Sequence, residues 1–308
     1  MQIAIVLYPQ FTALDFIGPY EVLRNLPGTE IRFVWHETGP IAADSGILLV
    51  GATHTLDETP SPDMILVPGG PGTIECARDE QLLAWLRVAH EASSWTTSVC
   101  SGSVILAAAG ILDGRRATSH WIALPVLRTF GVEPVGDERI VDASDGIVTA
   151  AGVSAGIDLA IWLAGQIVGE SRAKAIQLAL EYDPQPAFDS GHMSKASAAT
   201  KATAIAYLSR DSLKPAALQA TTALLWQQSV AAVRRRRSKS RHIQLRSAAS
   251  AWSAWVSMLT SEAMTLAMVP SARIAKVVRL VGMNLPSSEV RATPYAVATA
   301  PSTSASSG

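Results

Sequence analysis

Two cysteines occur in the chain, Cys76 and Cys100, and the second lies where a cysteine can act as a nucleophile. The run WTTSVC predicts a strand that ends at Cys100, and SGSVILAAAGIL predicts a buried helix directly after it. A sharp turn there lifts the side chain above the carboxyl end of the sheet, and the helix amides favour a thiolate. We predict a nucleophilic Cys100 with a lowered pKa. The alternative is a buried, inert thiol, which is also our interpretation of Cys76.

A glycine-rich loop, VPGGPGT at 67–73, follows another predicted strand. Gly69 and Gly70 leave room for backbone amides to approach a reacting atom. We predict an oxyanion site whose donors are the N–H groups of Gly70 and Ser101, with Gly69 beside them. The alternative is that the Pro-Gly-Gly sequence only shapes a tight turn.

A carboxyl group follows the first predicted strand, in the stretch LDFIGPYEVL at 14–23. If this strand and the strand that ends at Cys100 are neighbours in the sheet, Asp15 and Cys100 meet at its carboxyl edge. A carboxyl group there can hydrogen-bond the sulfur and move a proton during catalysis. The alternative for Asp15 is a helix N-cap.

Two further polar residues need an explanation. His120, in RRATSHWIAL, is either part of the substrate site or a hydrogen-bonded structural histidine beside Trp121. Asp158 lies on a helix that is otherwise apolar, and we expect it to cap that helix or pair with a neighbouring loop. The remaining histidines show no metal-ligand spacing, so we expect no metal site. They are His36, His54, His90, His192 and His242.

The elements that must position these residues alternate between short apolar runs and longer amphipathic stretches from Gln2 to about Glu181. This alternation predicts a mostly parallel sheet flanked by helices, an α/β fold. Two β-like runs around Asp145-Gly146 predict a hairpin. The predicted strands are 2–8, 31–35, 64–68 and 95–100, and the predicted helices are 14–26, 81–92, 101–112, 156–168 and 171–182.

Charge divides the chain near residue 200. The first 200 residues contain 11 Lys+Arg and 23 Asp+Glu, whereas the remainder contains 14 and 3. We predict a catalytic domain over 1–192 and a basic, Ala/Ser-rich extension over 193–308, partly helical or disordered. The run RRRRSKSR at 234–241 offers a weak nucleic-acid contact. The start lacks a signal-peptide pattern and the two cysteines lack paired spacing, so we expect a cytoplasmic protein without membrane spans.

Several longer strings resemble the ThiJ/PfpI superfamily, and within it the isonitrile hydratases, in the same order along residues 2–192. They are LDFIGPYEVL, VPGGPGT, SVCSGSVILAAAGIL, GRRATSHW, AGIDLA and LEYDPQPAFDSG. The resemblance implies a flavodoxin-like, doubly wound fold of the class I glutamine amidotransferase type, usually dimeric. It also implies Cys100 as nucleophile and Asp15 as the acid of an LDxxGP motif. The family usually has threonine after the nucleophile, where this chain has Ser101.

The resemblance implies a lyase that hydrates a small-molecule isonitrile to an N-substituted formamide through a cysteine thioimidate, a mechanism that requires no metal and no organic cofactor. An alternative remains open, because similar domains begin AraC-type transcriptional regulators. In that case the pocket would sense a metabolite and the basic extension would contact DNA. Another branch of the superfamily, which has protease-like activity, carries histidine directly after the nucleophile, so Ser101 argues against that chemistry.

Overall fold

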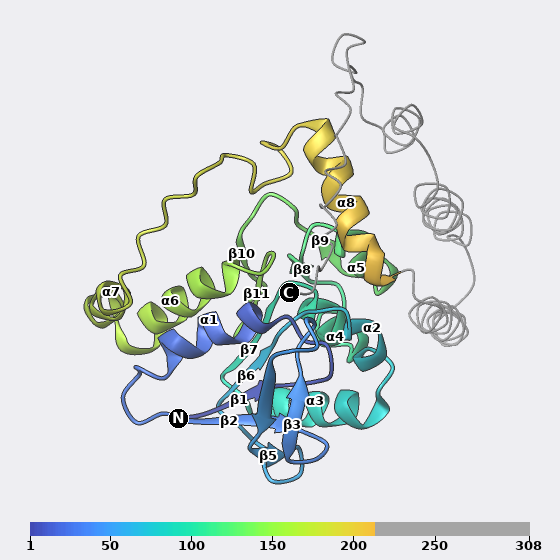
Figure 1. Cartoon of the computed structure of the whole chain (residues 1–308). Coiled ribbons are helices and arrows are strands. Elements are labelled where there is room, and N and C mark those ends of the chain that lie inside the picture. Colours follow the sequence, from blue (N-terminus) through green and yellow to red (C-terminus); the bar gives the residue numbers. More distant parts are fainter. Residues whose placement is uncertain (213–308) are drawn as a thin grey trace, which may run out of the picture. The chain divides into compact units, whose positions relative to one another are not determined.

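The computed structural model describes residues 1–212, with side chains to residue 208 (Figure 1). Its described part comprises two units: residues 1–188 together with 210–212, and residues 189–209. The first contains the predicted α/β sheet. The second contains the start of helix α8 (Ala198–Ser212) and an ion pair between Lys195 and Asp189 at 2.6 Å. The expected basic run at 234–241, and most of the expected extension, lie outside the described residues.

A seven-stranded sheet forms the centre of the first unit, in the order β10-β11-β7-β6-β1-β2-β5. All neighbouring pairs are parallel except β10 with β11. The central strands β6 and β11 are wholly buried, and β1 and β7 nearly so, as their apolar sequences require. The strands are β1 (Gln2–Val6), β2 (Glu30–Trp35), β5 (His54–Thr55), β6 (Met64–Val67), β7 (Trp95–Val99), β10 (Ile140–Asp142) and β11 (Ile147–Ala150).

Helices cover both faces of this sheet (Figure 1). On one face α1 packs against α6, and α7 packs against α6 in turn; on the other lie α3 and α4. Asp79 caps α3 by accepting a hydrogen bond from Leu82 N at 3.0 Å. The helices are α1 (Ala13–Leu23), α2 (Thr73–Cys76), α3 (Glu80–Ala92), α4 (Gly102–Ala108), α5 (Leu124–Thr129), α6 (Ala155–Val168) and α7 (Glu170–Ala179).

The predicted hairpin is confirmed, since β10 and β11 pair around Asp145-Gly146 with positive φ at both residues. The predicted helix after Cys100 is shorter than expected and ends at Ala108. The sequence pattern missed a two-stranded hairpin of β3 (Gly39–Ala42) and β4 (Leu49–Ala52). Another short pair joins β8 (Arg116–Ala117) to β9 (Glu133–Pro134).

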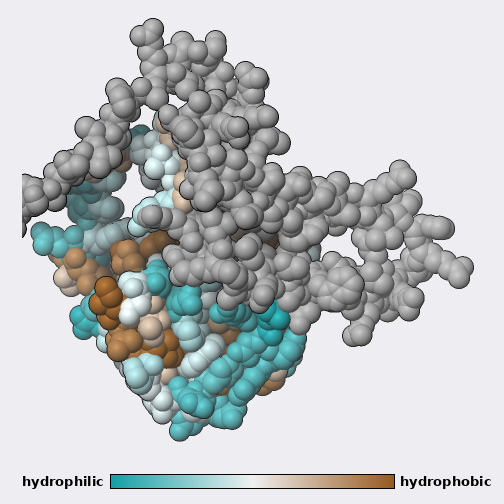
Figure 2. All heavy atoms as spheres, turned by 45° about the vertical axis from the view of Figure 1, so that its right-hand side comes forward, coloured by the Kyte–Doolittle hydropathy of each residue, from teal (hydrophilic) through white to brown (hydrophobic). Residues whose placement is uncertain are grey.

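The face of the described part that is visible in Figure 2 mixes hydrophilic and hydrophobic residues. Large exposed apolar side chains include Ile47, 88% exposed, and Leu49, 59% exposed, in and beside the tip of the β3–β4 hairpin. Within residues 1–212, no helix is both long enough and apolar enough to span a membrane.

Candidate active site

Cys100 lies on the sharp turn between β7 and α4, as predicted. Its φ is +58°, a left-handed conformation that costs a non-glycine residue strain and often marks a functional site. Two sets of hydrogen bonds hold the turn. Cys100 N donates to the carbonyl of Ala151 at 2.9 Å, and the Cys100 carbonyl accepts from Ser119 Oγ at 2.9 Å and Ser103 Oγ at 3.3 Å. The backbone is thus fixed on both sides of the sulfur.

The electrostatic surroundings of the Cys100 thiol correct our expectation of a lowered pKa. Burial raises the pKa of Cys100 well above its usual range, and the nearby Asp15 charge raises it further. Backbone N–H groups of Val153 and Ser101 act in the opposite direction and favour the thiolate. Desolvation outweighs these amides, so Cys100 rests as a thiol and needs a base to become a nucleophile.

Asp15 interacts with the Cys100 thiol and has the chemistry of such a base. Its side chain, in the first turn of α1, is fully buried, and Oδ2 accepts a hydrogen bond from Gly69 N at 2.8 Å. Among the described residues Oδ1 has no hydrogen-bond partner. Burial raises the pKa of Asp15 to about 7, while the Gly69 amide and the interaction with the Cys100 thiol oppose that rise. Asp15 is not the N-cap of α1, because the residue at that position is Thr12.

The strand order corrects the reasoning that placed Asp15 near Cys100. That reasoning was conditional on β1 and β7 being neighbours, and the condition is not met, because β6 lies between them. The loop after β6 fills the gap, since Gly69 donates to Asp15 and also lies against the Cys100–Ser101 backbone. A Cβ atom on Gly69 would come within 2.5 Å of Ser101 N. Three strand ends therefore meet at the thiol, and glycine is required at the middle one.

The two backbone N–H groups that we expected to form the oxyanion site are present, but both already have partners in the structure. Gly70 N donates to Ser101 Oγ at 3.1 Å, and Ser101 N interacts with the Cys100 sulfur. Gly70 has φ +145°, and a Cβ atom there would collide with the backbone of Gln10. The close approach predicted for the two glycines is confirmed. The Gly70 amide, however, is not a free donor in this arrangement.

The other residues that the sequence singled out make no hydrogen bond to Cys100 or Asp15 within the described part of the chain. Within the described residues the His120 ring makes no hydrogen bond to Cys100 or Asp15; it packs on Trp121 with centroids 5.4 Å apart. Burial lowers the pKa of His120. Asp158 pairs with Arg139 and accepts from Tyr182 Oη at 2.9 Å, which confirms its structural role. Cys76 is buried in α2.

Four residues near Cys100 were not found from the sequence: Tyr8, Thr73, Ser119 and Val153. Thr73 Oγ1 lies 2.8 Å from Ser101 Oγ and 3.2 Å from Tyr8 Oη, and Tyr8 donates to the Pro68 carbonyl at 2.9 Å. Val153 contributes a backbone amide, so its side-chain type carries no signal. The other three are common polar residues, and only the three-dimensional structure shows that they lie near Cys100. Within residues 1–212 no group of three or more His, Cys, Asp or Glu side chains is arranged to hold a metal ion.

The sequence of the chain is similar to the sequences of an enzyme and of a transcriptional regulator. The chain is 42% identical to the isonitrile hydratase of Pseudomonas putida over 191 residues, which cover 62% of this chain and 82% of that protein. It is 30% identical to the HTH-type transcriptional regulator CdhR of Pseudomonas aeruginosa, over 54% of this chain but only 51% of the regulator.

Solved structures of related proteins have a similar fold. A ThiJ/PfpI family protein from Pseudomonas syringae matches with a TM-score of 0.66 and 34% identity, over 73% of this chain and 90% of that one. Drosophila melanogaster DJ-1beta shares the fold, with a TM-score of 0.54 and 19% identity, over 59% of this chain and 98% of that one. The DJ-1/PfpI family pattern matches residues 1–166, and the chain therefore belongs to the DJ-1/PfpI family.

Proposed function

We propose that this protein is an isonitrile hydratase, which adds water to the terminal carbon of a small isonitrile and releases an N-substituted formamide. Its similarity to the hydratase of Pseudomonas putida supports this substrate class. One structural observation carries the chemistry: among the residues that the structure describes, none hydrogen-bonds the buried Asp15 Oδ1, while the same carboxyl group interacts with the Cys100 thiol. A buried polar atom without a partner is costly, and a proton received from the thiol would satisfy it.

The first step joins sulfur to carbon. Cys100 Sγ attacks the isonitrile carbon as its proton passes to Asp15, and Asp15 then delivers that proton to the same carbon. The product is a thioimidate in which carbon is bonded to sulfur and hydrogen and doubly bonded to nitrogen. A carboxyl group whose pKa is about 7 both accepts and returns a proton near neutral pH.

The second step consumes water. Asp15, again a carboxylate, takes a proton from water as the water oxygen bonds to the thioimidate carbon, and passes that proton to the nitrogen. The carbon–sulfur bond then breaks, the hydroxyl proton of the tetrahedral intermediate passes through Asp15 to Cys100, and the formamide leaves. The atoms of the isonitrile and of one water molecule together make up the formamide, so the reaction needs no further reactant.

The test is turnover of cyclohexyl isonitrile, followed by formamide production. Cys100→Ala should abolish turnover, with a loss of at least ~10³-fold in kcat, because the nucleophile is gone. Cys76→Ala is the matched control and should retain activity, since Cys76 is a buried cysteine in α2. Mass spectrometry of a rapidly quenched reaction should find the isonitrile mass on the peptide that contains Cys100. Full turnover by Cys100→Ala would exclude the proposal.

The similarity to CdhR supports a second candidate, a ligand-sensing regulator that uses the same pocket. The match covers only half of that regulator, and the basic run at 234–241 lies outside the described residues. Salt-sensitive, sequence-selective DNA binding by the full chain, without isonitrile turnover, would favour the regulator.

The setting of the enzyme is also a proposal. We place it in the cytoplasm, because its two cysteines are free thiols, which a reducing compartment preserves. We further propose that the protein is a homodimer, because the superfamily that its sequence resembles is usually dimeric. Size-exclusion chromatography with light scattering would test the oligomeric state.

A further inference from the structure

A line of hydrogen bonds runs from the glycine loop through Ser101 to the core. Gly70 N donates to Ser101 Oγ at 3.1 Å, Ser101 Oγ lies 2.8 Å from Thr73 Oγ1, and Thr73 Oγ1 lies 3.2 Å from Tyr8 Oη. Tyr8 Oη ends the line by donating to the Pro68 carbonyl at 2.9 Å. We call these three hydroxyl groups, of Tyr8, Thr73 and Ser101, the hydroxyl relay.

The last acceptor sets the direction of every hydrogen in the hydroxyl relay. A carbonyl oxygen only accepts, so the single hydroxyl hydrogen of Tyr8 is committed to Pro68. Thr73 must then donate to Tyr8, and Ser101 must donate to Thr73. Gly70 N–H fills one of the two acceptor positions on Ser101 Oγ. Ser101 therefore offers its surroundings only a lone pair.

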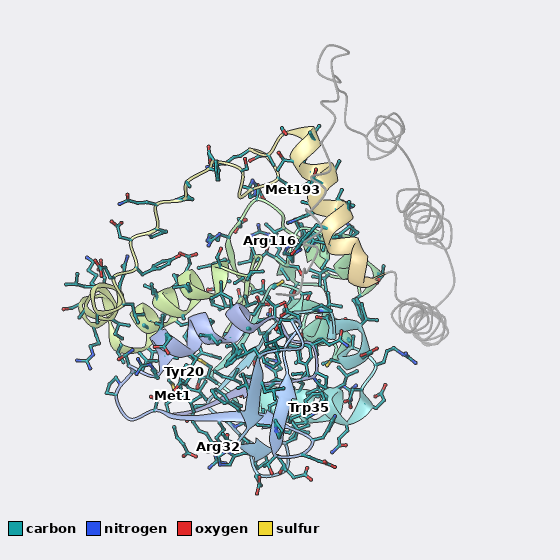
Figure 3. All side chains as sticks on the ribbon, in the orientation of Figure 1. Met1, Tyr20, Arg32, Trp35, Arg116 and Met193 are labelled. Carbon is teal, nitrogen blue, oxygen red and sulfur yellow. The ribbon has the colours of Figure 1, made fainter. Side chains whose placement is uncertain are left out.

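Tyr8 is well placed to hold this direction. Its side chain is fully buried, and its ring lies 6.3 Å from the ring of Trp35, which Figure 3 labels. Burial raises the pKa of Tyr8, so the hydroxyl group stays protonated at any pH at which the enzyme works. Thr73 is only 3% exposed, so water cannot easily replace either partner.

We propose that Tyr8 and Thr73 are positioning residues that hold Ser101 as a hydrogen-bond acceptor and thereby make the site select against carbonyl substrates. This inference rests on Cys100 being the nucleophile of the proposed function. Attack on an ester or aldehyde puts negative charge on oxygen, which needs donors such as the Gly70 amide or a serine O–H. The hydroxyl relay withdraws both donors. Attack on an isonitrile creates no oxyanion, and a lone pair on Ser101 can accept a hydrogen bond from the attacking water.

The experiment compares two covalent reactions of Cys100. With p-nitrophenyl acetate, the sulfur displaces p-nitrophenolate and becomes an acetyl thioester, while the thiol proton passes to Asp15; an oxyanion forms on the way. With iodoacetamide, the sulfur displaces iodide while the thiol proton passes to Asp15, and no oxyanion forms. The ratio of the two rates, measured as p-nitrophenolate release and as mass change at Cys100, reports oxyanion stabilisation alone. Accessibility and pKa of the thiol affect both reactions and largely cancel.

Thr73→Val and Tyr8→Phe each break the hydroxyl relay. Without Thr73 as its acceptor, Ser101 can turn its hydrogen toward the site. Without Tyr8 as its acceptor, Thr73 donates to Ser101 and frees the same hydrogen. We expect the acylation-to-alkylation ratio to rise about 10-fold or more in both variants, which is below the ~100-fold that a fully preorganised oxyanion donor contributes.

Two control variants distinguish this effect from general damage. Thr73→Ser keeps the hydroxyl group and should keep the ratio of the original protein. Thr97→Val removes a buried hydroxyl group on β7 that donates to the Ile65 carbonyl at 2.8 Å, outside the hydroxyl relay, and should not change the ratio. An unchanged ratio in both relay variants, or an equal rise in Thr97→Val, would overturn the inference. Neither reagent is an isonitrile, so the ratio can be interpreted even if the protein does not hydrate isonitriles.

Discussion

Two helices that pack against each other, α1 and α6, each place one aspartate in the first turn of an apolar sequence. The two aspartates have opposite environments. Asp158 is 28% exposed, and its two oxygens are taken by Arg139 and the Tyr182 hydroxyl. Asp15 is fully buried, and one of its oxygens has no partner within the described residues.

The difference shows how this fold separates structure from chemistry. A carboxylate with two partners and some water contact contributes to stability or costs little. A buried carboxylate with one empty oxygen is destabilising, and it persists because the surrounding strands, loops and helices hold it there. The α1 aspartate can therefore move a proton, whereas the α6 aspartate fastens the N-terminal end of its helix to the segment before β10.

The largest expected effect concerns activity. Asp15→Asn should lower kcat/KM for isonitrile hydration by ~100-fold or more, because the amide cannot accept the thiol proton. Asp158→Asn should stay within about threefold of the original activity. Initial rates of formamide production check both variants. Equal losses of activity in the two variants would mean that the different environments of the two aspartates do not give them different roles in catalysis.

The next effect concerns stability and pH. Folding raises the pKa of Asp15 from 3.8 to about 7, so between these values the folded protein binds a proton that the unfolded chain does not. Stability from this group is therefore greatest below about pH 4, falls as the pH rises, and levels off above about pH 7. The full change is about 4 kcal/mol as an upper figure. Asn does not titrate.

Denaturant unfolding of the original protein and of Asp15→Asn, each at about pH 4 and about pH 8, measures this effect. Asp15→Asn should gain stability relative to the original protein as the pH rises. A difference that is constant with pH would mean that Asp15 keeps an ordinary pKa in the folded protein.

The smallest effect should come from the α6 aspartate. Asp158→Asn removes an ion pair with a half-exposed arginine, and such pairs contribute about 0–1 kcal/mol. We expect a destabilisation of at most ~1 kcal/mol, measured by the same unfolding experiment at neutral pH. Arg139→Gln should match it, because each substitution breaks the same pair. A loss of several kcal/mol would show that this aspartate, too, depends on a buried environment.

Much of the fold could be predicted from local patterns. The runs at β1, β2, β6 and β7 are short and apolar, and the helices between them have regular amphipathic spacing, so strand–helix alternation indicated the parallel sheet. The β3–β4 hairpin was missed because residues 39–52 combine glycine with an exposed apolar tip and lack clean alternation. Strand order was also out of reach, because sequence alone does not say that β6 separates β1 from β7.

Five residues of the candidate site were predicted from the sequence, but the energetics of the site were not. Cys100, Asp15, Gly69, Gly70 and Ser101 come together as expected. The direction of the thiol pKa was wrong, because the prediction counted the helix amides and could not count the burial. Burial depends on residues distant in sequence.

The convergence of separate segments on Cys100 also determines when the environment of this thiol forms during synthesis. The groups that surround the sulfur include Asp15 near one end of the domain and the Val153 amide 138 residues later. Contacts between such distant positions form late, because closing long loops costs entropy. A growing chain that has passed Cys100 but not Val153 carries an ordinary cysteine. The assembled thiol–carboxyl pair therefore marks the completion of the sheet.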